Sequence, residues 1–243
     1  MNPSITGFAY LILSVTLLFF IYRLFQYWKR EKDVISKLWL YSIVLFLLFT
    51  LIKAIGGLFF TDNLVFLRET VYLGTFLHAL ILASMAYFVF YVKLPQISPW
   101  FGSIPIFVLG LIVTILTLNI RFNPFIGPSG AINWGIPASL FLTDVLRVFL
   151  YIIVFIPTII ILLQQFKHSE SIYAKRKTMG LIIFFSLLVV VGLIDFLFTP
   201  IFKLDPIWRD IGFIFSSIIL FISLVLTQKS PAVYSSAREI SGL

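Results

Sequence analysis

Long apolar runs separated by short polar connections dominate this chain of 243 residues. An α-helix rises 1.5 Å per residue, so about 20 predominantly apolar residues cross the hydrocarbon core of a bilayer. Seven runs reach that length, at approximately 5–27, 37–60, 70–92, 102–119, 139–163, 177–198 and 208–227. The pattern predicts an all-α membrane protein, with a seven-helix transmembrane domain over 1–230 and a short cytoplasmic tail over 231–243.

The composition supports this class. Hydrophobic residues make up 60% of the chain and charged residues 12%, whereas about a quarter of a soluble protein is charged. The alternative is a soluble protein with several buried helices. Seven such helices would leave almost no polar surface, so we set that alternative aside.

The cationic residues sort by side, although the net charge of +8 alone would also fit a nucleic-acid-binding protein. Of the 18 Lys and Arg residues, 12 fall at the connections or tail on one side of the predicted membrane. The other side receives Arg68, Arg121, Lys203 and Arg209. Positive loops stay cytoplasmic, which predicts an external N-terminus and a cytoplasmic C-terminus. We therefore expect a multi-pass protein of a bacterial inner membrane whose partner is the lipid bilayer and not nucleic acid.

Other features mark the boundaries and the close contacts of the spans. Trp134 and Trp208 are expected in the outer interfacial belt, and Trp28, Trp39 and Trp100 in the inner one. Pro157 predicts a kink in the fifth span, more often structural than a hinge. Small residues favour close helix approach at Gly56, Gly57, Gly180 and Gly192.

The longest outer connection, residues 120–138, is rich in glycine and proline, which precludes a helix. Connections of this length are often functional, but this one could equally be a passive cap.

Ionisable groups inside the outer half of the spans are the main candidates for a site. Lys53, Asp144, Arg147 and Asp195 lie within spans, and Arg68 and Glu69 begin the third. A charge near mid-membrane costs about 2.5–3.5 kcal/mol, so such groups must pair, face the interior or reach water. Asp144 and Arg147 share a helix face and are expected to pair, and Lys53 with Asp195 is a second expected pair.

Two interpretations of these charges remain open. One is structural pairing that fixes the bundle. The other is a water-accessible outer pocket for a small extracytoplasmic ligand. The candidate lining residues of that pocket are Lys53, Arg68, Glu69, Tyr72, His78, Asp144, Arg147 and Asp195.

Motifs for catalysis or cofactor binding are absent from the sequence. It has no Cys and only two His, His78 and His168, so neither a thiolate nor a histidine-rich metal site is expected. No hydrolase, protease, phosphate-binding or dinucleotide-binding motif occurs. The last span contains no Lys that could bind retinal covalently. We expect no enzyme activity and no cofactor.

Several stretches resemble the seven-transmembrane sensor region found at the N-terminus of many bacterial histidine kinases and diguanylate cyclases. They are the segment Arg68–Gly74, the segment Thr117–Asn119 with the Pro/Gly-rich loop closed by Trp134, and the basic segment Tyr173–Lys177 that leads to Gly180. The likeness covers about residues 8–232.

The resemblance implies signal reception, with no ligand specified. Sensor kinases of this type continue into a phosphoacceptor His and an ATP-binding domain, but this sequence has no His after His168. The expectation is therefore a stand-alone sensor module that signals through a cytoplasmic or membrane partner. The alternative is an accessory membrane subunit of a transporter or assembly complex, and an intramembrane enzyme acting on lipid is a weaker third possibility.

Overall fold

A computed structural model describes residues 2–32, 34–120, 122–135, 141–170, 172–195, 199 and 203–226. Within these ranges, seven helices are long and apolar enough to cross a membrane, which confirms the predicted all-α class. They are α1 (Ile5–Glu31), α2 (Val34–Phe59), α3 (Leu64–Lys93), α4 (Trp100–Leu118), α5 (Phe141–His168), α6 (Ile172–Leu193) and α8 (Ile207–Leu226). The predicted tail, residues 139, 140, 196–198 and 227 of the predicted spans, and Arg121 lie outside the described residues.

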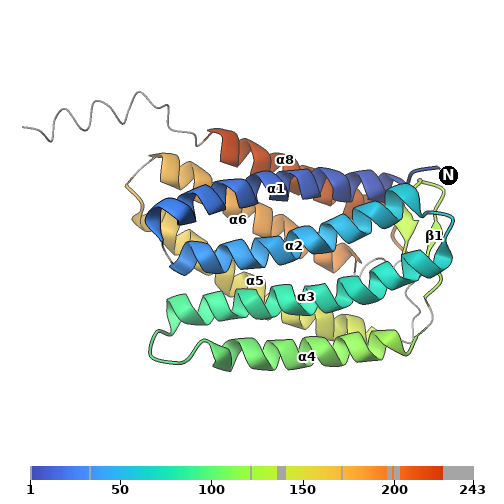
Figure 1. The fold of residues 1–243 in the computed structure, drawn as a ribbon, viewed down its shortest axis with the longest axis horizontal. Helices are drawn as coiled ribbons and strands as arrows, with labels where there is room; N and C mark the ends of the chain where they lie inside the picture. Colours follow the sequence, from blue (N-terminus) through green and yellow to red (C-terminus); the bar gives the residue numbers. More distant parts are fainter. Residues whose placement is uncertain are drawn as a thin grey trace, which may run out of the picture.

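The helices form a ring of six with one helix outside it. Around the ring, α1 packs on α2, α2 on α3, α3 on α5, α5 on α6, α6 on α8, and α8 returns to α1. Helix α4 packs against α3 and α5, and Figure 1 shows it at the edge of the bundle. The first and last described helices are therefore neighbours, and their contact closes the ring.

Helix α3 begins earlier than the hydropathy pattern predicts. The Asn63 side chain caps it by accepting a hydrogen bond of 3.0 Å from the Phe66 amide, which satisfies one of the free N–H groups of the first turn. Arg68 and Glu69 consequently lie inside α3 rather than at its outer end. Helix α5 runs through Pro157, and the kink expected there stays a prediction.

A close contact between glycines joins α1 to α2, as expected for the Gly56–Gly57 pair. A Cβ atom added to Gly7 would lie 2.5 Å from the carbonyl carbon of Gly57. Ser4, which caps α1, also donates a hydrogen bond of 2.8 Å to the Gly57 carbonyl. The predicted close approaches at Gly180 and Gly192 are confirmed as well, against Ser223 and Tyr151.

The Pro/Gly-rich connection forms a short antiparallel hairpin of β1 (Phe125–Ile126) and β2 (Ile132–Asn133). It covers the end of the bundle where α1 begins (Figure 1), which we call the hairpin end. The Gly130 carbonyl accepts a 3.0 Å hydrogen bond from the Ile5 amide. Several residues of this connection are buried, namely Phe122, Ala131, Ile132 and Trp134. Burial of Trp134 corrects its expected place in the interfacial belt, and Trp39 is buried too.

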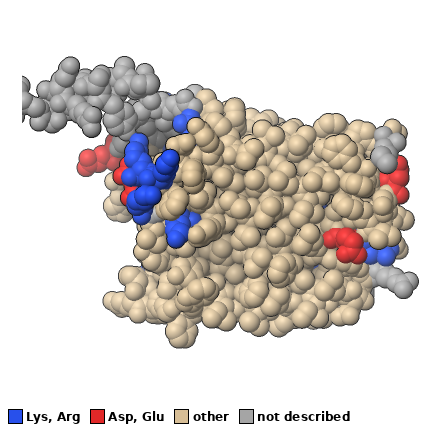
Figure 2. Space-filling model, in the orientation of Figure 1, with Lys and Arg blue, Asp and Glu red and all other residues tan. Residues whose placement is uncertain are grey.

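Positive charge gathers at the opposite end of the bundle, which we call the basic end. Figure 2 shows blue side chains grouped there, over the turn from α1 to α2. The described residues that carry this charge are Arg23, Lys29, Arg30, Lys32, Lys37, Lys93, Lys167, Lys175, Arg176 and Lys177. Arg209 was expected among the loop charges of the other side, but the structure buries it within α8. Because Arg209 is buried, fewer cationic side chains are exposed at the hairpin end, and the difference in positive charge between the two ends is larger than the sequence indicated.

Candidate functional site

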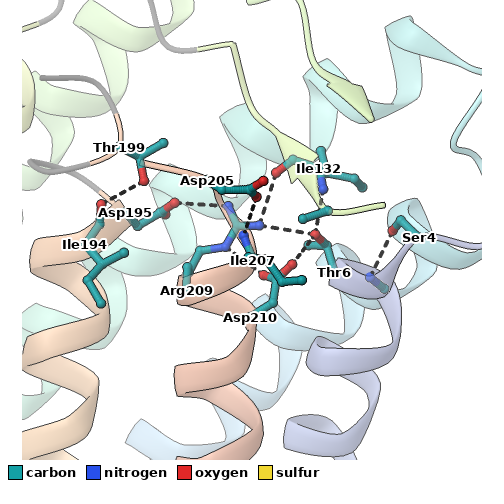
Figure 3. A network of polar contacts seen from close by, with 12 residues as sticks. Ser4, Thr6, Ile132, Ile194, Asp195, Thr199, Asp205, Ile207, Arg209 and Asp210 are labelled. Atoms are coloured by element: carbon teal, nitrogen blue, oxygen red, sulfur yellow. Dashed lines mark hydrogen bonds and ion pairs between the residues drawn. The ribbon is translucent and has the colours of Figure 1, made fainter. Parts of the chain in front are cut away.

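Arg209 is the centre of a buried polar network at the hairpin end (Figure 3). Its Nε donates to Asp210 at 2.8 Å, and its Nη1 donates to Asp195 at 3.0 Å. Its Nη2 donates to the Thr6 hydroxyl at 3.2 Å and to the Ile132 carbonyl at 3.1 Å. Only 1% of the Arg209 side chain is exposed, so these four bonds replace water around the guanidinium.

Thr6 completes this network from α1. Its hydroxyl donates to Asp210 at 2.5 Å and accepts a 2.7 Å hydrogen bond from the Ile132 amide. The three partners Thr6, Ile132 and Arg209 thus connect α1, the hairpin and α8, and Asp195, two residues after the end of α6, joins the network through Arg209. The network holds the ring closed at the point where the first and last described helices meet.

A second buried ion pair lies on α5, between Arg147 and Asp144. The Arg147 Nη1 and the Asp144 carboxylate are 3.1 Å apart, which confirms the pairing predicted from their spacing. Nη2 of Arg147 also donates to the Thr117 hydroxyl at 2.5 Å. This pair therefore attaches α4 to α5.

Lys53 is a buried cation of a different kind. Only 6% of it is exposed, and its Nζ lies 3.6 Å from the centre of the Trp134 ring, where the ring face attracts a cation. Within the described part of the chain, Lys53 makes no ion pair and no hydrogen bond. The expected Lys53–Asp195 pair is wrong, because Asp195 pairs with Arg209 instead.

Lys53 and Asp195 nevertheless line the same cavity, which we call the polar chamber. It has a volume of about 50 Å³ and also contacts Arg147, Trp134 and Thr75. Gly74 forms part of its wall, and a Cβ there would lie 3.0 Å from Cε of Lys53. The missing side chain at Gly74 thus leaves room for the Lys53 side chain.

An apolar cavity of about 40 Å³ adjoins the polar chamber deeper in the ring. The two cavities share four lining residues, Tyr10, Phe49, His78 and Asp195. The remaining lining of the apolar cavity is mostly aromatic and aliphatic, including Phe46, Met85, Phe155 and Phe185. Residues from all six helices of the ring contribute to it, so it lies on the ring's axis.

A wider pocket of about 420 Å³, which we call the vestibule, lies between the hairpin and the start of α8. Its polar lining includes Asn133, Thr199, Lys203, Asp205 and Arg209. Trp134 and Asp195 line both the vestibule and the polar chamber. These two side chains therefore form the partition between the hairpin-end surface and the interior.

The structure brings together half of the residues proposed from sequence. Lys53, His78, Arg147 and Asp195 line the chamber, and Asp144 lies behind Arg147. The other three lie elsewhere. Arg68 and Tyr72 donate hydrogen bonds of 2.8 Å to the carbonyls of Phe122 and Ile120, so they hold the loop before the hairpin. Glu69 is exposed.

Sequence reasoning missed Thr6, Tyr10, Trp134, Arg209 and Asp210. The adjacent charges Arg209 and Asp210 at the start of an apolar span were the available signal. Hydropathy alone assigns such residues to the aqueous side, because it does not reveal that a hairpin covers them. The sequence likewise did not show that Trp134 is buried, because an aromatic residue at the boundary of a span commonly lies at the membrane interface.

Comparisons of the chain with models of protein families, with curated proteins and with solved structures found no match. Within the described ranges, no group of three His, Asp or Glu side chains is arranged to hold a metal ion. The arrangement of the chamber and vestibule is therefore the basis for a functional proposal.

Proposed function

We propose that this chain is a receptor-like module of a bacterial inner membrane, which binds a small ligand from outside the cytoplasm and signals through a partner protein. One observation carries the proposal. A chamber with a buried cation, Lys53, adjoins a vestibule at the hairpin end, and the described side chains that line both are Trp134 and Asp195. A site of this kind, concave and with few polar groups, is typical of small-molecule binding.

The charge distribution supports the orientation. Loops rich in Lys and Arg remain cytoplasmic, so the basic end faces the cytoplasm and the hairpin end faces outward. With this orientation, the vestibule is reached from the extracytoplasmic side.

The network around Arg209 provides a route for coupling. Asp195 lines the chamber and also pairs with Arg209 on α8. Helices α6 and α8 pack on one another and continue to the basic end. A ligand that contacts Asp195 changes the balance of this ion pair, and a receptor requires that its two states bind the ligand with different affinity.

The test is site-specific photo-crosslinking in native membranes. A photoreactive residue at Lys37, on the basic end, is expected to capture a kinase, a cyclase or a response-regulator component. The same residue placed at Glu69, on the hairpin end, is the control and should not capture it. Recovery of transporter or secretion subunits from Lys37 would contradict the receptor proposal.

A second candidate function, an accessory subunit of a membrane complex, has one observation in its favour. An apolar groove of about 470 Å³ lies between α2, α3 and α4, and it is lined by Tyr41, Tyr87, Trp100 and Phe107 among others. A groove facing the bilayer can receive a helix of another subunit. The crosslinking experiment separates this function from the receptor function.

A further inference from the structure

We infer that the polar chamber binds a small zwitterion with an apolar body, of the class of the aliphatic α-amino acids. This inference rests on the proposed function, and it names the ligand class for the same site. It follows from the charges on the chamber walls, from the apolar cavity beneath them and from the available volume.

One part of the chamber wall carries the positive charge of Lys53, which no anionic side chain among the described residues balances directly. Lys53 is 94% buried and its ammonium group lines the chamber. Its Nζ lies 3.6 Å from the centre of the Trp134 ring, and no carboxylate among the described residues pairs with it. A buried ammonium is stabilised far more by an anionic partner than by an aromatic face alone. The position suits a ligand carboxylate.

Another part of the chamber wall carries a negative charge in excess, at Asp195. Arg209 pairs with two carboxylates, Asp210 at 2.8 Å and Asp195 at 3.0 Å, so this group has one negative charge in excess. Asp195 accepts through Oδ1, and its Oδ2 accepts no hydrogen bond from the described residues. The position suits a ligand ammonium group.

The ion pair of Arg147 and Asp144 does not change the net charge around the chamber, because its two charges cancel. A ligand carrying only a negative charge would leave the Asp195 side uncompensated, and a cation would leave Lys53 uncompensated. A zwitterion complements both walls and keeps the buried region neutral, which avoids the cost of burying net charge.

The apolar cavity determines the rest of the ligand. It adjoins the chamber through Tyr10, Phe49 and His78 and continues toward Phe155 and Phe185. A cavity needs about 10–15 Å³ for each water molecule that it holds, so cavities of about 40 and 50 Å³ each hold three or four water-sized groups. Together they accommodate roughly six to eight non-hydrogen atoms, which matches an amino acid such as valine and is far too small for a diacyl lipid.

The experiment measures equilibrium binding of radiolabelled valine to the purified full chain in nanodiscs. Competitors are isovalerate, which lacks the amine, and isobutylamine, which lacks the carboxylate. Alanine and leucine serve as size variants. We expect saturable binding of valine, alanine or leucine, with each singly charged analogue at least about tenfold weaker, since a charge-assisted contact contributes about 1.5–3 kcal/mol.

Variants locate the site. Lys53→Met and Asp195→Asn are each expected to weaken valine binding at least about tenfold. Glu69→Gln is the matched control, because Glu69 is an exposed carboxylate at the same end of the bundle, and it should bind as the wild type does. The analogue series on the wild-type chain needs no variant to fold.

Other outcomes overturn the inference in distinguishable ways. If isovalerate or isobutylamine binds as tightly as valine, the zwitterion is wrong, while a ligand-binding chamber remains. If none of the three amino acids binds at 10 mM, roughly the upper range of weak ligands, the ligand class is wrong. The receptor function itself fails only through the crosslinking result at Lys37.

Discussion

Lys53 and Arg209 are both buried cations, but their surroundings differ. Arg209 donates four hydrogen bonds, two of them to carboxylates, whereas Lys53 has an aromatic ring and a cavity. A cation with complete partners stabilises the fold that holds it. A cation without them costs stability and is retained for another purpose, which is the usual balance at a functional site.

The two residues should therefore respond oppositely to the same substitution. Lys53→Met removes a buried ammonium that makes no direct ion pair with the described residues, and it is expected to raise the free energy of unfolding by about 2 kcal/mol. Arg209→Met leaves the buried Asp210 and the half-buried Asp195 without their guanidinium partner and is expected to lower the free energy of unfolding by about 3–5 kcal/mol. Thermal unfolding of both variants in the same detergent measures the difference. A lower melting temperature for Lys53→Met would contradict our description of the Lys53 site.

For individual side chains, spacing along the sequence predicted a contact within one helix but not the contacts between helices. Asp144 and Arg147 lie three residues apart, so helix geometry alone placed them together. Asp195 was predicted to pair with Lys53 because the two residues lie at a similar depth in the membrane, but it pairs with Arg209. Depth gives no information on which helices are neighbours, and the ring order brings α6 against α8.

The hairpin and the first helix form one unit at the level of elements. Hydropathy predicted every long helix, because each needs only a sufficient apolar run. It did not predict β1 and β2, whose strands are two residues each. Their docking depends on tertiary hydrogen bonds, such as that from the Ile132 amide to Thr6, and no local pattern encodes them.

The contact of α1 with α2 gives a prediction with an internal control. A Cβ at Gly57 would lie 2.7 Å from the backbone of Gly7, whereas a Cβ at Gly56 would lie 3.1 Å from a Thr70 methyl group. Backbone cannot move aside as a side chain can, so Gly57→Ala is expected to cost about 1–3 kcal/mol. Gly56→Ala should cost clearly less. Chemical or thermal unfolding of the two variants tests this, and equal losses would show that α1 and α2 separate without strain.

The whole molecule is asymmetric along its long axis, with the site at one end and the positive charge at the other. The chain has no natural cysteine, so single cysteines report orientation directly. Glu69→Cys should react with a membrane-impermeant maleimide in intact spheroplasts, because the proposed orientation places the hairpin end outside the cytoplasm. Glu31→Cys should react only after permeabilisation. The reverse labelling pattern would invert the topology and would place the vestibule on the cytoplasmic side.

Closure of the ring by its first and last described helices has a consequence for how the protein is made. Thr6 and Arg209 are 203 residues apart in the chain, and ribosomes add about 5–20 residues per second. The nascent α1 thus spends roughly 10–40 seconds without its partner on α8. Lys53, Asp144 and Arg147 also enter the bilayer before the ring is complete. Successful biogenesis therefore requires that the insertion machinery or an early helix pair shelter these polar groups until the last span arrives.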